Sequence, residues 1–159
     1  MNLFLWNLLL AFFWAAVSND LTLFSLIEGF LFGFFILWMT RKTLGQVKYF
    51  RRVYLAVTFL FYFIGELVRS SLRVAHDILT PQHQMNPGVI AIEMKVKTEF
   101  EITFLANLIS LTPGTLTLDI SSDRRLLFVH AMYIHQHDVS KFKAHISNSL
   151  EKRVLELLR

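Results

Sequence analysis

Residues 3–17 (LFLWNLLLAFFWAAV) and 21–39 (LTLFSLIEGFLFGFFILWM) are two apolar runs separated by the polar turn Ser18-Asn19-Asp20. As helices they would be about 22 Å and about 28 Å long at ~1.5 Å per residue. Because the hydrocarbon core of a bilayer is ~30 Å thick, the second run is long enough to span it. The first needs a thinner bilayer or help from flanking residues. We therefore predict a membrane protein that begins with an α-helical hairpin.

Apolar residues and charges are unevenly distributed along the 159 residues. Hydrophobic residues make up 54% of the chain and the mean hydropathy is +0.47, more than one soluble core of this size needs. Residues 1–74 carry the whole net charge of +4, whereas residues 75–159 hold equal numbers of acidic and basic side chains. The positive charge is therefore typical of membrane flanks, and no basic excess is left for a nucleic-acid partner. The absence of cysteine excludes disulfides and thiol nucleophiles.

A third apolar run, residues 53–74, is predicted to form a transmembrane or interfacial helix. Its first half is almost entirely apolar and favours spanning, whereas its charged second half favours lying in the membrane surface. The basic loop before it, residues 41–52, is expected in the cytoplasm by the positive-inside rule. The sequence leaves open which side of the membrane holds residues 77–159.

Residues 1–76 are thus assigned to membrane helices, at 3–17, 21–39 and 53–74. Pro81, Pro87 and Gly88 then interrupt the chain and predict a linker over residues 77–88.

Residues 89–159 are predicted to fold as a small α+β domain outside the hydrocarbon, with the element order β-α-β-β-α. The strands are expected at residues 89–97, 115–120 and 126–133. Thr98 and Glu101 have the spacing of a capping box that starts a helix, and Asp138 is expected to cap the final helix. Both helices would cover one face of a three-stranded sheet.

Four residues of the second apolar run are candidates for a role in the membrane. Ser25, Gly29 and Gly33 recur every four residues, a spacing that lets another helix backbone approach closely. Glu28 lies among them, and an ionised carboxylate at mid-bilayer costs ~2.5–3.5 kcal/mol, so it should face protein or water. It is either part of a proton or cation relay or a protonated, hydrogen-bonded packing residue.

Other polar residues give weaker signals. Glu66, the second possible intramembrane acid, lies three residues before Arg69, which allows an intrahelical ion pair at the membrane edge or a role in an ion path. His130, His135 and His137 lack the cysteines or clustered acids that would complete a metal site, so we expect neither metal nor cofactor. The sequence has no nucleophile elbow, phosphate loop, HExxH motif or paired catalytic carboxylates, and we expect no enzyme.

The stretch LANLISLTPGT is the most specific motif of the sequence. It comprises Leu105, Ala106, Asn107, Leu108, Ile109, Ser110, Leu111, Thr112, Pro113, Gly114 and Thr115. It closely resembles the signature of the E subunit of Mrp-type (Mnh or Pha) multisubunit monovalent cation/proton antiporters. Val129-His130-Ala131 resembles the family's VHA element, and the total length and the two-part layout are also similar to that family.

This resemblance implies an accessory subunit of a multisubunit Na+/H+ antiporter complex, multi-pass in a bacterial cell (inner) membrane. The subunit would contribute to cation extrusion and pH homeostasis by packing and docking, while large subunits hold the main ion paths. Its partners would be the other subunits and the lipid bilayer, with Na+ and H+ as the ions of the whole complex. The residues alone leave open a structural or assembly scaffold, or a membrane-anchored binding module with no part in the ion path.

The motif also has a structural interpretation. Its four aliphatic side chains are expected to form an apolar helix face and the exit from that helix: Leu105, Leu108, Ile109 and Leu111. Asn107 or Ser110 would satisfy carbonyls where the helix ends, and Pro113-Gly114 would turn the chain into the next strand. A docking surface for another subunit is a second possible role.

Overall fold

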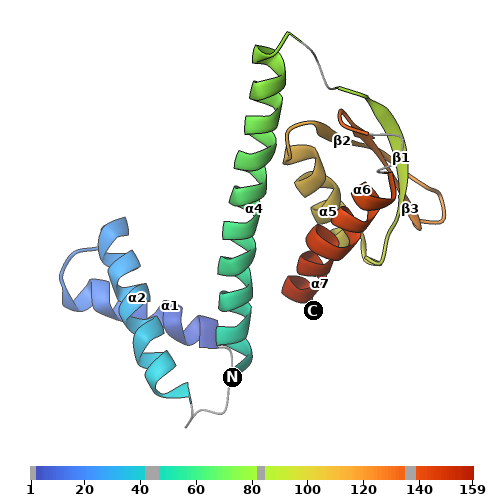
Figure 1. Ribbon diagram of the computed structural model, residues 1–159. Coiled ribbons are helices and arrows are strands. Elements are labelled where there is room, and N and C mark those ends of the chain that lie inside the picture. Colours follow the sequence, from blue (N-terminus) through green and yellow to red (C-terminus); the bar gives the residue numbers. More distant parts are fainter. Residues whose placement is uncertain (1–2, 42–46, 82–84, 135–138) are drawn as a thin grey trace. The chain divides into compact units, whose positions relative to one another are not determined.

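The structure of the chain is a computed structural model that describes residues 3–41, 47–81, 85–134 and 139–159 (Figure 1). The described chain is mostly helical with one small three-stranded antiparallel sheet, as predicted for its helices and its α+β part, whereas its placement in a membrane stays a prediction. It divides into two compact units, Met1–Tyr54 and Leu55–Arg159. The division falls inside helix α4 (Val47–Leu79), and the linker expected over residues 77–88 stays a prediction.

The first unit is built on two helices, α1 (Leu3–Val17) and α2 (Leu23–Met39), that pack against each other. Asn19 takes a left-handed conformation with φ of 50° in the turn between them. α2 begins two residues later than predicted because Thr22 is its N-cap. The Thr22 Oγ1 accepts a hydrogen bond from the Ser25 amide at 3.3 Å, so Thr22 itself stays extended.

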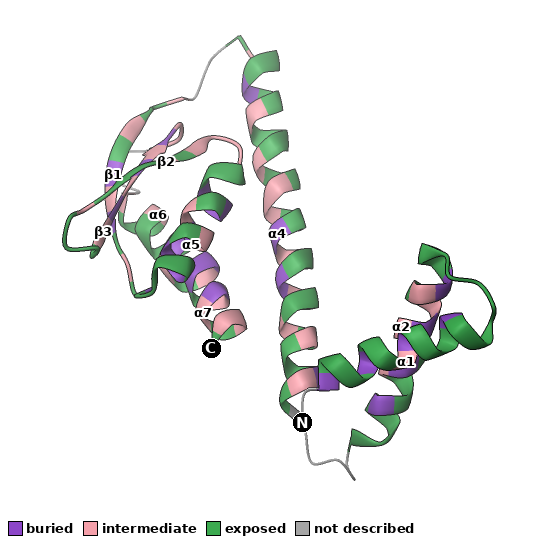
Figure 2. Cartoon of the chain, turned by 180° about the vertical axis from the view of Figure 1, so that it is seen from behind, coloured by how far each residue is buried: buried purple, intermediate pink, exposed green. Residues whose placement is uncertain are grey.

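Most large apolar side chains of the hairpin are exposed (Figure 2). Phe13 is 69% exposed, Leu23 75% and Phe35 59%. A continuous apolar surface of this kind is typical of contact with lipid or with other subunits. The two helices thus bury only a narrow seam between them.

α4 is longer than predicted at both ends. It runs to Leu79, two residues before Pro81, and a proline disfavours helical conformation of the residue before it. Among the described helices, only α4 is long and apolar enough to cross a membrane, over Lys48–Leu79. The helices of the hairpin are apolar but shorter than that criterion.

The second unit contains the sheet. Its strands are β1 (Gly88–Glu93), β2 (Thr115–Ile120) and β3 (Leu126–Ala131), in the spatial order β1-β3-β2 with both pairs antiparallel. Its helices are α5 (Glu99–Leu111), α6 (Val139–His145), the π-helix η1 (Ile146–Glu151) and α7 (Lys152–Leu158). The elements follow the predicted order, and the helices lie on one face of the sheet (Figure 1).

One hydrophobic core joins the sheet to these helices. It includes Ile90 and Val129 from the sheet, Leu105 from α5 and Val154 from α7, all 5% exposed or less. Phe59 and Phe63 of α4 belong to the same cluster. Therefore the part of α4 after residue 54 packs as an element of the α+β domain.

β1 ends at Glu93, four residues before the predicted end of the strand. The amides of Lys95 and Val96 donate to the Glu151 carboxylate and so are not available to a strand partner. Glu151 reaches them because the π-helix has a wider turn than an α-helix, which directs two consecutive residues, Leu150 and Glu151, inward.

The predicted capping box is confirmed at the start of α5. The Glu101 amide donates to the Thr98 Oγ1, and the Thr98 amide donates to the Glu101 carboxylate, both at 3.2 Å. The cap predicted at Asp138 lies outside the described residues. α6 begins at Val139, immediately after it.

Candidate functional site

Ser25, Gly29 and Gly33 form a buried stripe on α2 that faces α1. A Cβ on Gly29 would lie 2.8 Å from the carbonyl oxygen of Ala11, and a Cβ on Gly33 would collide with Oδ1 of Asn7. Real Cβ atoms do not approach other heavy atoms this closely, so a larger residue at Gly29 would push the α1 backbone away, and one at Gly33 would first displace the Asn7 side chain. The stripe brings the backbones of the hairpin together.

Asn7 is the most buried polar side chain of the hairpin, and sequence reasoning missed it. Its relative exposure is 0%, and its Nδ2 donates to the Tyr49 hydroxyl at 3.3 Å. Its Oδ1 and the Ser25 Oγ have no hydrogen-bond partner among the described residues. The signal available in the sequence was an amide within an otherwise apolar run. Glu28 is only half-buried on α2.

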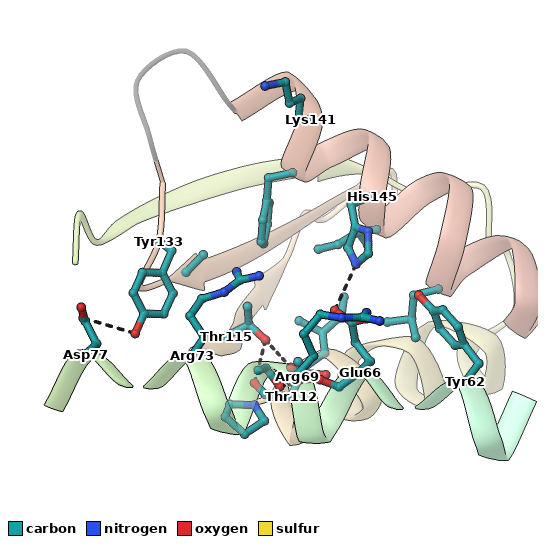
Figure 3. Close-up of a pocket in the computed structure, with 18 of the residues that line it drawn as sticks. Tyr62, Glu66, Arg69, Arg73, Asp77, Thr112, Thr115, Tyr133, Lys141 and His145 are labelled. Carbon is teal, nitrogen blue, oxygen red and sulfur yellow. Dashed lines mark hydrogen bonds and ion pairs between the residues drawn. The ribbon is translucent and has the colours of Figure 1, made fainter. Parts of the chain in front are cut away.

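Glu66 lies on α4 and contacts two cationic or titratable groups (Figure 3). Its Oε2 accepts from Arg69 Nη1 at 2.8 Å, so the predicted intrahelical pair is present. Its Oε1 lies 3.3 Å from Nε2 of His145 on α6, a contact that the sequence did not indicate. The Glu66 side chain is 18% exposed and that of Arg69 is 66% exposed, so this pair by itself adds little to stability.

A second contact joins α4 to the end of the sheet. The Tyr133 hydroxyl donates to Oδ2 of the buried Asp77 at 3.3 Å (Figure 3). Burial and the nearby Asp77 carboxylate raise the pKa of Tyr133, so the phenol keeps its proton and remains a donor. Asp77 and Glu66 are three helical turns apart on α4. Through Tyr133 and His145 they connect this helix to the rest of the domain at two positions.

The LANLISLTPGT motif forms the second half of α5 and the turn into β2. Leu105, Leu108 and Ile109 are buried in the core. Leu111, the last residue of the helix, is 62% exposed, so of the four aliphatic residues it alone is not covered by the core. α5 ends at this residue, and the chain turns away from the core before the side chain can be covered.

The carbonyls at the end of α5 are satisfied by threonines rather than by the predicted Asn107 or Ser110. Three hydroxyls donate to them: Thr112 to Leu108 at 3.0 Å, Thr115 to Ile109 at 2.6 Å and Thr117 to Ala106 at 3.1 Å. Asn107 is exposed, and the Ser110 Oγ accepts from the Thr117 amide at 3.1 Å. These hydrogen bonds therefore connect the end of α5 to the start of β2.

The start of α5 holds an unusually acidic carboxyl group. Arg159 donates to Oε1 of Glu101 at 3.1 Å, and the amides of Lys97 and Thr98 donate to Oε2. Hydrogen bonding by the Arg159 guanidinium, followed by the two amides, lowers the pKa of Glu101 to about 2. The carboxylate thus connects α5 to the end of α7.

Of the three histidines considered for a metal site, only His130 lies in the part of the chain that the structure describes. His130 lies in β3, opposite Leu116 of β2 and Val89 of β1. His135 and His137 lie outside the described residues. His130 is flanked by the buried Val129 and Ala131, so the VHA element contributes core residues on one face of the sheet.

Comparison with known sequences gives consistent matches over nearly the whole chain. Residues 7–157 match the family described as MNHE, Na+/H+ ion antiporter subunit. The Na(+)/H(+) antiporter E subunit of Alkalihalophilus pseudofirmus is 33% identical over 153 residues, which cover 96% of each chain. The protein of the same name from Bacillus subtilis is 36% identical over 153 residues, with the same coverage.

Two solved structures are also similar. A chain of the Mrp complex from Dietzia sp. DQ12-45-1b is 30% identical with a TM-score of 0.50, covering 65% of this chain and 96% of that one. A chain of the membrane-bound sulfane sulfur reductase, an archaeal respiratory membrane complex, is 25% identical with a TM-score of 0.58. That match covers 96% of both chains.

Proposed function

The chain belongs to the family of Na+/H+ antiporter E subunits, and we propose that it supports its complex by packing in the membrane and docking outside it. It is an accessory subunit of a multisubunit membrane complex and not an enzyme. The observation that carries this conclusion is the match over residues 7–157, which includes both the hairpin and the α+β domain.

The names of the relatives indicate the ions. The relatives from Alkalihalophilus pseudofirmus and Bacillus subtilis are named as subunits of Na+/H+ antiporters. The complex of this chain would therefore exchange Na+ for H+ across a bacterial cell membrane. Such exchange would serve cation extrusion and pH homeostasis. The other subunits and the lipid bilayer would be the partners of the chain.

We place α1 and α2 in the bilayer as two passes, which makes the chain multi-pass. Their exposed apolar side chains support this placement, because water would not solvate such a surface favourably. The Arg41 guanidinium lies 4.9 Å from the centre of the Trp38 ring at the end of α2. Tryptophan and arginine at a helix end are typical of the membrane–water interface.

We propose that residues 55–79 of α4 lie along the membrane surface. Buried Phe59, Phe63 and Asp77 face the α+β domain, and a domain with charged surface residues packed along a helix would not enter the hydrocarbon. The opposite face is apolar and between 45% and 70% exposed, at Val57, Leu60, Phe61, Ile64, Val68 and Leu72. That face is suited to lipid or to another subunit.

This placement of α4 puts the α+β domain in the cytoplasm, because a two-pass hairpin with a cytoplasmic basic loop returns the chain to that side. Protease added to sealed right-side-out vesicles is expected to leave the domain intact, and protease added to everted vesicles is expected to remove it. Cleavage in right-side-out vesicles only would show that α4 spans.

Deletion tests the proposed function. Everted vesicles from cells that lack the chain are expected to lose Na+-dependent proton exchange, measured with a pH-sensitive dye. Expression of the intact chain should restore it. Exchange at normal rates without the chain would overturn the proposal.

Two conservative substitutions test the packing role. If the chain holds no ion path, vesicles with Glu28→Gln or Glu66→Gln are expected to exchange Na+ for H+ at rates within about twofold of the unmodified complex. Complex assembly is measured in parallel by co-purification in mild detergent. Loss of exchange in a fully assembled complex would instead assign that carboxyl group to the ion path.

A further inference from the structure

A cavity of about 510 Å³ lies between α4, the turn after α5, and the α6 region (Figure 3). Its volume is within the ~300–1,000 Å³ that small-molecule sites occupy. Polar side chains line one part of it and apolar side chains line another. The apolar part includes Ile109, Phe142, Ile146 and Leu150.

Cationic side chains exceed anionic ones in the lining. Arg69, Arg73, Glu66 and Asp77 line the cavity from α4, and Lys141 lines it from α6. Both acids are already engaged within the protein, the first by an arginine and a histidine and the second by the Tyr133 hydroxyl. The cavity therefore suits an anion and not a metal cation.

Arg73 is the residue best placed to bind that anion. Its guanidinium lies 5.8 Å from the centre of the Tyr133 ring and points along the cavity beside it (Figure 3). Among the described residues, no carboxylate oxygen lies within 4 Å of its nitrogen atoms. Lys141 also lines the cavity, from α6, and its amine points away from Arg73 (Figure 3).

We propose that this cavity binds a phosphate group, with Arg73 as its cationic ligand, and that the group belongs to an anionic phospholipid. A guanidinium forms bidentate, charge-assisted hydrogen bonds with phosphate oxygens. The apolar wall at Phe142 and Ile146 gives the glycerol and the first carbons of an acyl chain a surface to contact.

The choice of a lipid rests on the proposed placement of α4 at the membrane surface. The face of α4 opposite the domain is apolar, so the helix that carries Arg73 would lie at the depth of the lipid headgroups. A headgroup at this depth is attracted by arginine and lysine side chains.

The test uses the purified full-length chain in mild detergent. Binding of dihexanoyl phosphatidylglycerol, dihexanoyl phosphatidylcholine and inorganic phosphate is titrated separately by native mass spectrometry, with Arg73→Gln and Arg124→Gln as the variants. Arg124 is an exposed arginine outside the lining and paired with Glu99, so it controls for the loss of one positive charge. Thermal unfolding shows whether each variant is folded, and Arg73→Lys serves as the conservative variant.

Phosphatidylglycerol is expected to bind at least tenfold more tightly than phosphatidylcholine. Arg73→Gln is expected to weaken this binding about tenfold, Arg124→Gln to leave it unchanged and Arg73→Lys to weaken it less. Equal affinity of Arg73→Gln and the unmodified chain for phosphatidylglycerol would overturn the proposal. So would the absence of binding to either lipid and to phosphate.

Two further outcomes identify another occupant. Binding of inorganic phosphate that depends on Arg73, without retention of phosphatidylglycerol, would support the phosphate site and overturn the lipid. If Arg73→Gln prevents co-purification of other subunits and leaves lipid retention unchanged, the cavity holds an acidic protein segment and the proposal is wrong.

The inference and the proposed function fail separately. An assembled, exchanging complex whose chain retains no phosphatidylglycerol would overturn only the lipid site. Retention of the lipid by a chain that neither co-purifies with other subunits nor affects exchange would overturn only the proposed function.

Discussion

Gly29 of α2 lies so close to Ala11 of α1 that a Cβ on the glycine would come 2.8 Å from the Ala11 carbonyl oxygen. This contact is between two backbones, and a neighbouring side chain cannot relieve it by changing its rotamer. Helix association in a membrane depends on such close approach, because lipid tails solvate apolar side chains as well as another helix does.

Gly29→Ala is therefore expected to separate α1 from α2 and to destabilise the hairpin by ~1–3 kcal/mol. The matched control is Gly65→Ala in α4, where an added Cβ would meet no atom within 4 Å. That change is expected to be neutral or to stabilise its helix by up to ~1 kcal/mol. The melting temperatures of both variants are compared in mild detergent, and equal values would contradict the close contact.

Gly114→Ala is expected to destabilise the α+β domain by ~1–2 kcal/mol, because Gly114 has a φ of +88°, where L-residues are strained. The space around it is adequate, since the atom nearest to an added Cβ would be a Tyr133 ring carbon at 3.5 Å. Asparagine tolerates the left-handed region better, so Gly114→Asn should cost less. Thermal unfolding followed by circular dichroism measures both, and an alanine variant as stable as the asparagine variant would refute the explanation.

Glu151→Ala is expected to destabilise the domain by ~1–3 kcal/mol, because the amide of the buried Val96 would lose its acceptor, whereas Lys95 is exposed and its amide can turn to water. Glu151→Gln keeps a side-chain oxygen and should cost less. Glu156→Ala, on the exposed side of α7 next to Lys152, is the control and is expected to change stability by less than ~1 kcal/mol. Denaturant unfolding in detergent measures these differences, and a mild effect of Glu151→Ala would mean that water reaches the Val96 amide.

The low pKa of Glu101 predicts that the stability of the folded chain depends on pH. Its pKa is about 2 in the folded chain, against an ordinary value of 4.5, so its contribution to stability is complete above pH 4.5 and is lost as the pH falls toward 2. The melting temperature of Glu101→Gln should therefore be lower than that of the unmodified chain at pH 7, and the two should converge between pH 4.5 and pH 2.

Glu99→Gln is the control for this pH series, since the Glu99 side chain is 77% exposed and pairs with an exposed arginine. It should follow the unmodified chain at every pH. A difference between Glu101→Gln and the unmodified chain that stays constant down to pH 2 would show that ionisation of Glu101 does not stabilise the fold.

Local sequence signals predicted the elements of this protein well. The Thr98–Glu101 capping box requires only residues three apart in the chain, and the Glu66–Arg69 pair only one helical turn, so both were predictable and both are present. The polar turn after Val17 and the Pro113-Gly114 turn ended their helices as predicted, because the conformations that these residues favour are set locally.

Contacts formed only in the tertiary structure caused two of the errors. The early end of β1 depends on Glu151, which is more than fifty residues away, and on the π-helix that directs its carboxylate inward. The carbonyls of α5 are satisfied by Thr115 and Thr117, which approach only after β2 has packed beside the helix. The hydrophobic periodicity of the sequence does not predict which of these residues will form hydrogen bonds with each other.

The sequence by itself determined that the chain has an apolar, positively flanked half and a periodic α+β half, because hydropathy and residue spacing are properties of the covalent chain. Only the tertiary structure decided that α4 packs on the domain from Phe59 to Asp77, and that Glu66 meets His145 beside Arg73. A helix has several faces, and its sequence does not specify which neighbour will cover each one. That choice follows from the free energy of packing the whole domain.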